Sequence, residues 1–413
     1  MNIPARLIAV ALVILAGSGG GPARAAEETL PLADALAAAL VDAGVRIATH
    51  VPATGATEVY DAFCARAGQP KIYSYNEETA YTLAHGAAIG GARSVAILKS
   101  HGFAKAANSI VDSIVAGTTA GFVVLVFHDA TGSHSDTVLD TAALVGGTKI
   151  PVIQTGPEAA CAAIFQAFQT AERLHLPVAV VLDSDDLSQS VAAPREQLPP
   201  PAAVYRRDIY QFLLCPLLAP YQTRLLEARR AGQEPPADKP ALPTVPDGLP
   251  PKFKTAALTY QPVFDAFKKT KGDDAVVAGD AGTSTLFAFP PYDCVDLTTF
   301  YGGSIPLACG LYLAGRTNAW AVCGDFAFIA ATHLGLPEAL QRRIPLKVLI
   351  FHNGVAAATG GQPIQPEVFE NTIGGWRDYV RTVRSGADPA EIERTLAAAK
   401  ASDRLEIVVV EVP

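Results

Sequence analysis

The sequence has few charges and no long basic segment. Only 17% of its 413 residues are charged, with 32 basic against 40 acidic side chains and a formal net charge of −8. Half of the residues are apolar, which excludes a disordered chain. Basic residues occur in runs no longer than a pair. The sequence therefore argues against a general nucleic-acid-binding surface and predicts no nucleic-acid partner.

Closely spaced cysteines and periodic glycine are also missing. The six cysteines are scattered, and none belongs to a C-x-x-C pair. This excludes a disulfide-dense scaffold, a zinc knuckle and a cysteine-rich iron–sulfur motif. The 34 glycines and 31 prolines follow no period, which excludes collagen.

No apolar run is long enough to span a membrane. The N-terminal run, residues 7–16, is too short for a hydrocarbon core of about 30 Å. Arg6 precedes this run, glycines break it at 17–21, and Ala-Arg-Ala at 23–25 fits a signal cleavage site. We therefore predict a signal peptide over residues 1–25 and an exported, periplasmic product with no stable membrane span after signal removal. The alternative is a cytoplasmic protein with a misassigned start.

The first part of the chain alternates between short apolar runs and helical stretches. The expected strands are 46–51, 72–75, 94–98, 122–128 and 178–183. Such runs predict a parallel sheet covered by helices on both faces. We assign residues 26–190 to this first domain.

A proline-rich connection, residues 191–252, interrupts the alternation. It holds 13 of the 31 prolines, and Pro216 and Pro220 should divide its one helical stretch, 210–230. A second α/β domain, 253–413, follows. Its expected strands are 275–279, 320–323, 346–352 and 405–412. The predicted fold class is α/β, with two parallel-sheet domains, each with helices on both faces, joined by a long proline-rich connection.

Polar residues follow two strands of the second domain. Gly324, Asp325 and Phe326 end one strand, and Asn353 ends the next. The carboxyl ends of parallel strands share one edge, so Asp325 and Asn353 should lie close together. Their oxygens suit Mg²⁺ or Ca²⁺ bound to phosphates. The alternative is a strand turn with Asp325 as a helix cap.

Glycine-rich turns at other strand ends favour a diphosphate site. Gly302, Gly303 and Ser304 precede an apolar helix, 307–314, whose N-terminus could receive phosphate. A further turn of this kind, 279–284, ends the first strand of the same domain.

The first domain carries candidate acid–base residues. Glu77 and Glu78 open an apolar helix that is rich in alanine and glycine, which implies close packing of another backbone or ligand. The alternative role for both acids is helix capping. His101 and His134 follow two of the strands and could transfer protons near pH 7, although a loop histidine is more often a surface residue.

In this order, these pieces resemble the thiamine-diphosphate (ThDP) enzymes, with a pyrimidine-binding domain first and a diphosphate-binding domain second. The pattern E-x-x-A-x-x-x-A-x-G fits residues 77–86 with Glu77 in register. Gly324-Asp325 with Asn353 matches the family's metal and diphosphate motif, and Phe326 replaces its third glycine. The resemblance implies ThDP and Mg²⁺ as cofactors, with the metal held by Asp325, Asn353 and the backbone carbonyl of Val355.

Within the family, the sequence looks most like the large subunit of indolepyruvate ferredoxin oxidoreductase. The likeness rests on residues 76–77, 133–135, 279–291 and 359–363, where Thr359 begins a Thr-Gly-Gly-Gln-Pro element taken as a cofactor contact. The two-domain length instead looks like phosphonopyruvate and sulfopyruvate decarboxylases, although three alanines, 356–358, replace a His-Asp-Ser of the phosphonopyruvate type. The oxidoreductases' cysteine pair is absent at 253–257.

The resemblance implies a non-oxidative decarboxylase or carboligase that acts on a small 2-oxoacid. Glu77 would hydrogen-bond the cofactor's aminopyrimidine ring, and His101 and His134 would transfer protons or bind the substrate carboxylate. A homodimer or homotetramer is implied because the family places the cofactor between subunits. Two alternatives are an oxidoreductase subunit whose electron carrier lies on another chain, and an exported, non-catalytic ThDP-binding protein.

Overall fold

A computed structural model describes residues 28–193 and 196–413, and the predicted signal peptide lies outside these residues. The first domain is built on a sheet of five parallel strands in the order β2-β3-β4-β6-β5. The strands are β2 (Ile47–His50), β3 (Ser94–Lys99), β4 (Phe122–His128), β5 (Val152–Gln154) and β6 (Val178–Asp183). A separate antiparallel pair joins β1 (Glu28–Pro31) to β7 (Ser190–Ala193).

Helices cover both faces of this sheet, as predicted. One face packs against α1 (Leu32–Asp42), α2 (Ala56–Ala67) and α7 (Ala160–Leu174). The other packs against α3 (Glu77–Ile89), α4 (Ser100–Lys105), α5 (Ala107–Ala116) and α6 (Thr141–Thr148). Successive residues of β3 alternate between the two cores, so the strand is apolar on both sides and reads as a continuous run.

The expected strand at 72–75 is wrong. This segment forms no strand: Ser74 N donates to the carbonyl of His50 at the end of β2 at 2.8 Å, and side chains take the carbonyl groups of Ile72 and Tyr73. The hydroxyl of Tyr60 donates to the Ile72 carbonyl at 2.8 Å, and Gln341 Nε2 donates to the Tyr73 carbonyl at 3.1 Å. The segment therefore joins the first domain to a helix of the second.

The second domain holds six parallel strands in the order β14-β15-β11-β10-β8-β9. They are β8 (Val276–Gly279), β9 (Leu297–Thr298), β10 (Ala319–Gly324), β11 (Lys347–His352), β14 (Val380–Arg384) and β15 (Glu406–Glu411). The sequence predicted four of these strands and missed the edge strands β9 and β14. Strand β9 has only two residues, and β14 is partly exposed and polar, so neither forms an apolar run.

Helices cover both faces of the second sheet too. Helices α10 (Pro251–Lys271) and α15 (Pro389–Ala401) pack on one face. On the other lie α11 (Ser304–Leu313), α12 (Asp325–Ala330), α13 (Leu336–Gln341) and α14 (Pro366–Gly374). A short hairpin joins β12 (Val355–Ala356) to β13 (Gln362–Pro363). The 3₁₀ turns are η1 (Pro157–Ala159), η2 (Ser184–Asp186), η3 (Thr283–Ala288), η4 (Thr332–Gly335), η5 (Ala357–Thr359) and η6 (Arg377–Tyr379).

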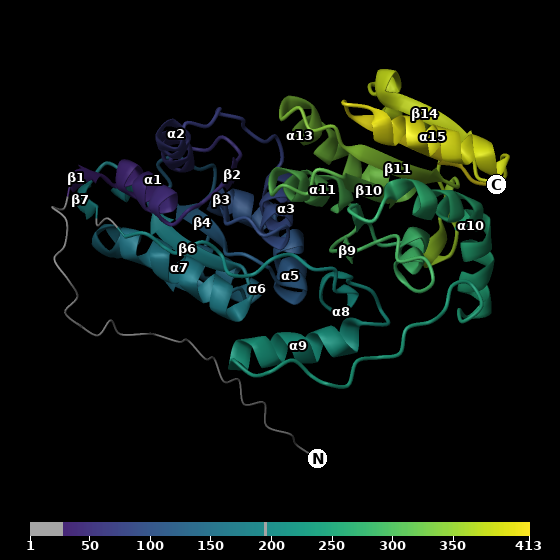
Figure 1. The fold of residues 1–413 in the computed structure, drawn as a ribbon. Coiled ribbons are helices and arrows are strands. Elements are labelled where there is room, and N and C mark those ends of the chain that lie inside the picture. The colour runs from purple at the N-terminus through teal and green to yellow at the C-terminus, as the bar shows by residue number, and fades with distance from the viewer. Residues whose placement is uncertain (1–27, 194–195) are drawn as a thin grey trace, which may run out of the picture.

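Two small-residue helices meet between the domains. Helices α3 and α11 lie side by side in the middle of the molecule (Figure 1). A Cβ atom added at Gly86 of α3 would lie 2.3 Å from the Leu307 carbonyl oxygen, and one at Gly310 of α11 would lie 2.1 Å from the Leu83 carbonyl oxygen. The close packing predicted for the first of these helices is therefore confirmed, and the second backbone is that of α11.

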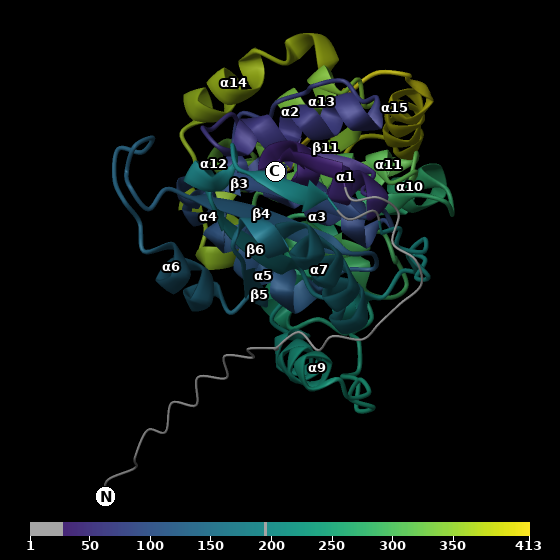
Figure 2. The ribbon, with the colours of Figure 1, turned by 90° about the vertical axis from the view of Figure 1, so that its left-hand side faces the viewer.

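The proline-rich connection contacts both domains. It contains α8 (Ile209–Phe212) and α9 (Ala219–Ala231), so the predicted helix is divided near Pro216 and Pro220 as expected. Arg93 of the first domain donates to the Pro199 carbonyl at 2.7 Å, and Arg207 of the connection donates to Asp296 of the second domain at 2.7 Å. Viewed from the first-domain side, α9 lies at the opposite end of the molecule from α14 (Figure 2).

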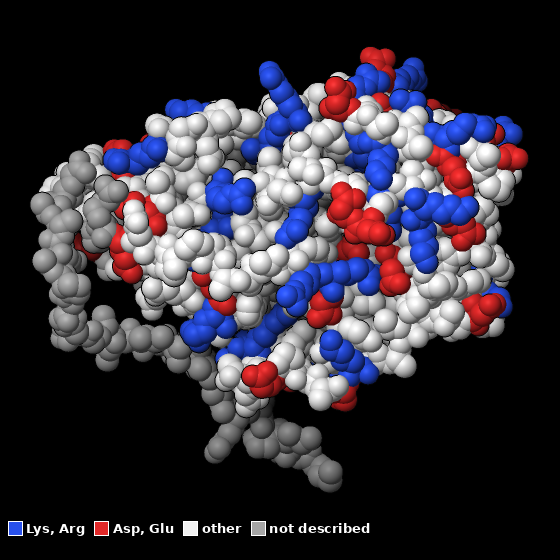
Figure 3. Space-filling view, viewed as in Figure 1, with Lys and Arg blue, Asp and Glu red and all other residues white. Residues whose placement is uncertain are grey.

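Basic and acidic side chains are intermixed on the face shown in Figure 3. No helix of the described residues is both long and apolar enough to cross a membrane. All six cysteines lie among the described residues as free thiols, and five of them are buried. Burial raises the pKa of every one of these thiols.

Candidate active site

The second-domain site forms where β10 and β11 end side by side. Asp325 is buried and begins α12 directly after β10, and Asn353 follows β11. The Asp325 carboxylate accepts hydrogen bonds from the backbone N–H groups of Asn353 at 3.0 Å and Gly354 at 2.7 Å, and His352 Nδ1 lies 2.9 Å from the same oxygen. The other oxygen accepts from Phe326 N at 2.8 Å. The predicted pair, Asp325 and Asn353, is thus brought together.

The side chain of Asn353 is held at both ends. Its Nδ2 donates to the hydroxyl of Tyr260 at 3.0 Å, and its Oδ1 accepts from Val355 N at 3.1 Å. Val355, whose carbonyl was expected as a ligand, begins β12 and pairs with Pro363. Tyr260 comes from α10, and no sequence pattern pointed to it.

Three glycines leave space at this edge of the sheet. They are Gly282 in the loop after β8, Gly324 at the end of β10, and Gly354 in the loop after β11. A Cβ atom at Gly282 or Gly354 would meet nothing within 4 Å, and one at Gly324 would meet only the Phe351 carbonyl oxygen, 4.0 Å away. A ligand could therefore approach the backbone closely here. With a carboxylate and an amide oxygen alongside, these loops fit Mg²⁺ on a diphosphate.

The turn at Gly302, Gly303 and Ser304 is already capped from inside the domain. Ser304 N donates to Asp280 Oδ1 at 2.8 Å, and the hydroxyl of Thr332 donates to Asp280 Oδ2 at 2.5 Å. All three turn residues are buried, and burial raises the pKa of Asp280 to about 6. The N–H group of Ser304 at the start of α11 thus serves an internal carboxylate in the described structure.

Two neighbouring aromatic side chains are exposed beside the site. Tyr301 is 40% exposed and Phe326 is 45% exposed, and their ring centroids are 6.0 Å apart. Phe326 was predicted as a cofactor contact and Tyr301 was not. The hydroxyl of Thr359, another predicted contact, donates to Gln362 at 2.8 Å within the hairpin loop.

Glu77 occupies the N-terminus of α3 in the first domain. Asn76 caps this helix by accepting from Thr79 N at 3.0 Å. Glu77 Oε2 is buried and accepts no hydrogen bond from the described residues, although Lys105 Nζ lies 3.0 Å away as an ion-pair partner. Gly102 makes room for the side chain, because a Cβ there would lie 2.9 Å from Glu77 Cγ. Beside this ion pair, Glu77 Oε2 receives no hydrogen bond from the described residues, so it keeps a lone pair that could accept from a ligand.

Glu78, the neighbour of Glu77, has different partners. Asn108 Nδ2 donates to Glu78 Oε1 at 3.1 Å. Burial raises the pKa of Glu78. The two adjacent acids are therefore in distinct environments.

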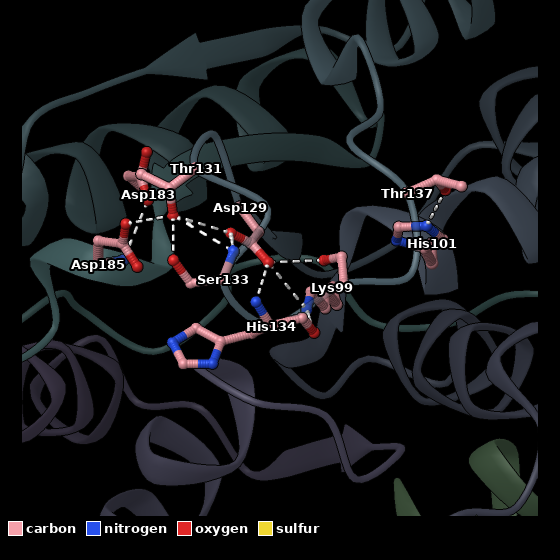
Figure 4. A network of polar contacts seen from close by, with 10 residues as sticks. Lys99, His101, Asp129, Thr131, Ser133, His134, Thr137, Asp183 and Asp185 are labelled. Atoms are coloured by element: carbon pink, nitrogen blue, oxygen red, sulfur yellow. Dashed lines mark hydrogen bonds and ion pairs between the residues drawn. The ribbon is translucent and has the colours of Figure 1, made fainter.

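A charged pair holds the loop that carries His134 (Figure 4). His134 N donates to Asp129 Oδ2 at 2.8 Å, and Lys99 Nζ donates to the His134 carbonyl at 2.5 Å. Lys99 and Asp129 are themselves 3.5 Å apart and buried. A hydrogen bond from the Ser135 hydroxyl, followed by those from the loop backbone and the Lys99 charge, holds the pKa of Asp129 well below its usual range. The imidazole of His134 points away from this network.

His101 lies on α4, apart from this charged pair. Its Nε2 is 2.9 Å from the hydroxyl of Thr137, which belongs to the same loop as His134. The structure therefore connects both predicted histidines to one loop. It does not place them in hydrogen-bond contact with each other.

Glu77 and Asp325 belong to separate half-sites. The ion pair of Glu77 lies within the first domain. The hydrogen bonds of Asp325 lie within the second. Each domain therefore presents its own set of candidate residues.

Comparison with known proteins agrees with this geometry. Residues 280–412 match the family described as "Thiamine pyrophosphate enzyme, C-terminal TPP binding domain". The chain resembles the thiamine-diphosphate-dependent enzymes. This is the family that the sequence motifs predicted, and the matched residues include Asp325 and Asn353.

Curated relatives support the predicted likeness to indolepyruvate enzymes. "Indolepyruvate oxidoreductase subunit IorA" of Methanothermobacter marburgensis is 32% identical over 130 residues, which cover 30% of this chain and 21% of the relative. The subunit of the same name from Pyrococcus abyssi is 30% identical over 182 residues, covering 38% and 28%. The chain therefore aligns with about a quarter of the length of these relatives.

Solved ThDP enzymes share the fold over nearly the whole chain. A putative thiamin diphosphate-dependent enzyme of Mycobacterium smegmatis has a TM-score of 0.63 at 15% identity, covering 93% of this chain and 99% of that one. Benzoylformate decarboxylase of Polynucleobacter necessarius has a TM-score of 0.64 at 10% identity, covering 92% and 98%. The predicted two-domain ThDP fold is thus confirmed.

Proposed function

We propose that this protein is a ThDP- and Mg²⁺-dependent enzyme that decarboxylates a small 2-oxoacid without oxidation, or joins the product to a carbonyl compound. The observation that carries the proposal is the pair of half-sites. In one, a buried Glu77 oxygen, ion-paired with Lys105, accepts no hydrogen bond from the described residues; in the other, three glycines leave open space beside Asp325 and Asn353. Two neighbours in fold over more than nine-tenths of the chain are named decarboxylases, of benzoylformate and 4-hydroxybenzoylformate.

Each group would have a definite task. Asp325, Asn353 and the Val355 carbonyl would hold Mg²⁺ on the diphosphate, and Glu77 would share a proton with the pyrimidine ring. ThDP, when bound, supplies the electron sink that makes loss of CO₂ feasible. His134 and His101 would bind the substrate carboxylate or carry a proton, since the Lys99–Asp129 pair fixes the backbone of the loop that presents His134.

A second candidate is a 2-oxoacid oxidoreductase subunit whose electron carrier lies on another chain. The identity of 30–32% with IorA subunits favours it. The two activities separate in one assay, because only the oxidoreductase would reduce a viologen dye as the 2-oxoacid is consumed. Release of an aldehyde without dye reduction supports the decarboxylase.

A third candidate is an exported ThDP-binding protein without activity. A pair of variants distinguishes it from an enzyme. Glu77→Gln should abolish turnover and leave ThDP binding largely intact. Glu78→Gln, one residue out of register, is the matched control and should keep turnover. Equal activity in the Glu77→Gln variant would contradict the assignment of Glu77.

The cofactor itself is tested by calorimetry. The chain from Ala26 onward is titrated with ThDP in Mg²⁺ and again with a chelator. Metal-dependent binding that is lost in Asp325→Ala supports the proposal. No binding at millimolar ThDP would contradict it.

We also propose a homodimer, because each half-site could meet its complement on a second copy. Exposed aromatic residues near the two half-sites support this, since Tyr75 is 73% exposed and lies two residues before α3, while Tyr301 and Phe326 are exposed beside Asp325. Sedimentation velocity tests the proposal. A monomer that turns over substrate would contradict it.

The export prediction for residues 1–25 stands as a proposal beside these. Expression of the full chain followed by mass spectrometry of the periplasmic fraction tests it. A mature N-terminus at Ala26 supports export, and an intact Met1 in the cytoplasm contradicts it.

A further inference from the structure

The hydroxyl of Tyr260 contacts the loop after β11 in the second-domain site. Tyr260 is in the middle of α10 and is only 5% exposed. Its hydroxyl accepts from Asn353 Nδ2 at 3.0 Å, in the loop after β11. The phenol thus connects α10 to the loop that carries Asn353.

The contact with Val355 determines which way the Asn353 amide faces. The backbone N–H of Val355 can only donate, so the amide end 3.1 Å from it must be the oxygen. The NH₂ group then faces Tyr260, whose hydroxyl accepts from it.

The ring of Tyr260 is also held rigidly. It stacks on Phe351, with ring centroids 4.3 Å apart and planes 8° from parallel. Phe351 lies in β11, two residues before Asn353. The hydroxyl is therefore positioned by the same strand that carries the amide it contacts.

We propose that Tyr260 is a positioning residue of the metal site, which fixes the Asn353 amide so that its oxygen is presented to the Mg²⁺ of bound ThDP. The inference rests on the proposed function. Removing the phenol oxygen would leave the Asn353 NH₂ without its partner, so the amide would be held only through the hydrogen bond between its Oδ1 and Val355 N. Loss of such an outer partner typically weakens metal binding about 10- to 100-fold.

The test compares Tyr260→Phe with Tyr292→Phe. Tyr292 is the matched control, because it is also 5% exposed in the same domain and its hydroxyl donates to Asp265 at 2.8 Å. The readout is the Mg²⁺ concentration at which ThDP binding, followed by calorimetry, is half-maximal. Tyr260→Phe should raise this concentration about 10- to 100-fold, and Tyr292→Phe should leave it unchanged.

A second background separates positioning from general damage. In Asn353→Ala, the additional change Tyr260→Phe should have no further effect, because the tyrosine acts through the amide. A further loss in this background, or an equal loss in Tyr292→Phe, would overturn the inference. If the wild-type chain binds ThDP with Mg²⁺ and the Tyr260→Phe variant needs the same Mg²⁺ concentration, the inference about Tyr260 is overturned and the proposed function stands. A wild-type chain without any such binding would overturn the proposed function as well.

Discussion

Replacing Gly86 or Gly310 by alanine should force the two domains apart. An added Cβ would lie 2.3 Å from the Leu307 oxygen in the first case and 2.1 Å from the Leu83 oxygen in the second. A relaxed carbon–oxygen contact is about 3.3–3.6 Å, so the helices must separate by roughly 1 Å. Overpacking of this kind costs about 1–3 kcal/mol. The helical preference of alanine over glycine returns about 0.5–1 kcal/mol, so the expected net loss lies between roughly 0 and 2.5 kcal/mol, with a centre of about 1 kcal/mol.

Urea denaturation followed by tryptophan fluorescence measures this effect, because both tryptophans, Trp320 and Trp376, lie in the second domain. The control is Gly146→Ala in helix α6, where an added Cβ meets nothing within 4 Å. That change should raise the urea midpoint, since alanine stabilises an open helical site by about 0.4–1 kcal/mol. The double variant Gly86→Ala/Gly310→Ala should lose less than the sum of the two single losses, because one separation of the helices relieves both clashes.

The opposite signs of the variants make the reasoning refutable. If Gly86→Ala and Gly310→Ala raise the urea midpoint as Gly146→Ala does, the helices are not in backbone contact. Strict additivity of the double variant would show that the two glycines serve separate contacts.

Two further variants test buried charge and buried histidine. Arg93→Met removes one partner of the Arg93–Glu172 pair (2.6 Å), and because Arg93 is only 2% exposed it should cost about 3 kcal/mol in urea denaturation. Lys269→Met breaks the exposed ion pair of Lys269 with Glu393 and should lower the free energy of unfolding by under about 1 kcal/mol. An equal loss of stability in Arg93→Met and Lys269→Met would refute the argument that burial sets the cost. His85 is buried, and desolvation lowers its pKa from 6.5 to about 4. Only the unfolded chain gains this proton as the pH falls from 6.5 towards 4, so the folded state should lose up to about 3 kcal/mol over this window. His85→Gln should flatten the slope of unfolding free energy against pH, and an unchanged slope would contradict the buried neutral imidazole.

The fold was predictable where a strand is buried on both sides. Strands β3, β4 and β6 are continuous apolar runs, and β10 and β11 end in the Gly-Asp and Asn of the metal motif. Parallel geometry then brings the two ends together without further information. The edge strands lack such runs, and the segment 72–75 is apolar but is held by side chains from elsewhere.

The residues that surround the site depend on contacts distant in sequence. Tyr260 lies 93 positions from Asn353, and no local pattern connects them. Asp280 stood within a recognised glycine-rich turn, yet its role as an internal cap for Ser304 depends on how two loops fold together. The pairing of Lys99 with Asp129 could have been predicted from the sequence, because a charged residue at the end of a buried strand needs an oppositely charged partner at the same sheet edge.

The reaction of the free cysteine thiols with a thiol reagent would report local unfolding of the chain. Thiol reagents attack the thiolate, which burial and a raised pKa keep scarce in the native state. Each buried cysteine is therefore modified only when its surroundings open. Cys64 and Cys161 sample the core of the first domain, and Cys309 samples the helix that packs between the domains. Their labelling rates would map local stability across the molecule without any engineered probe.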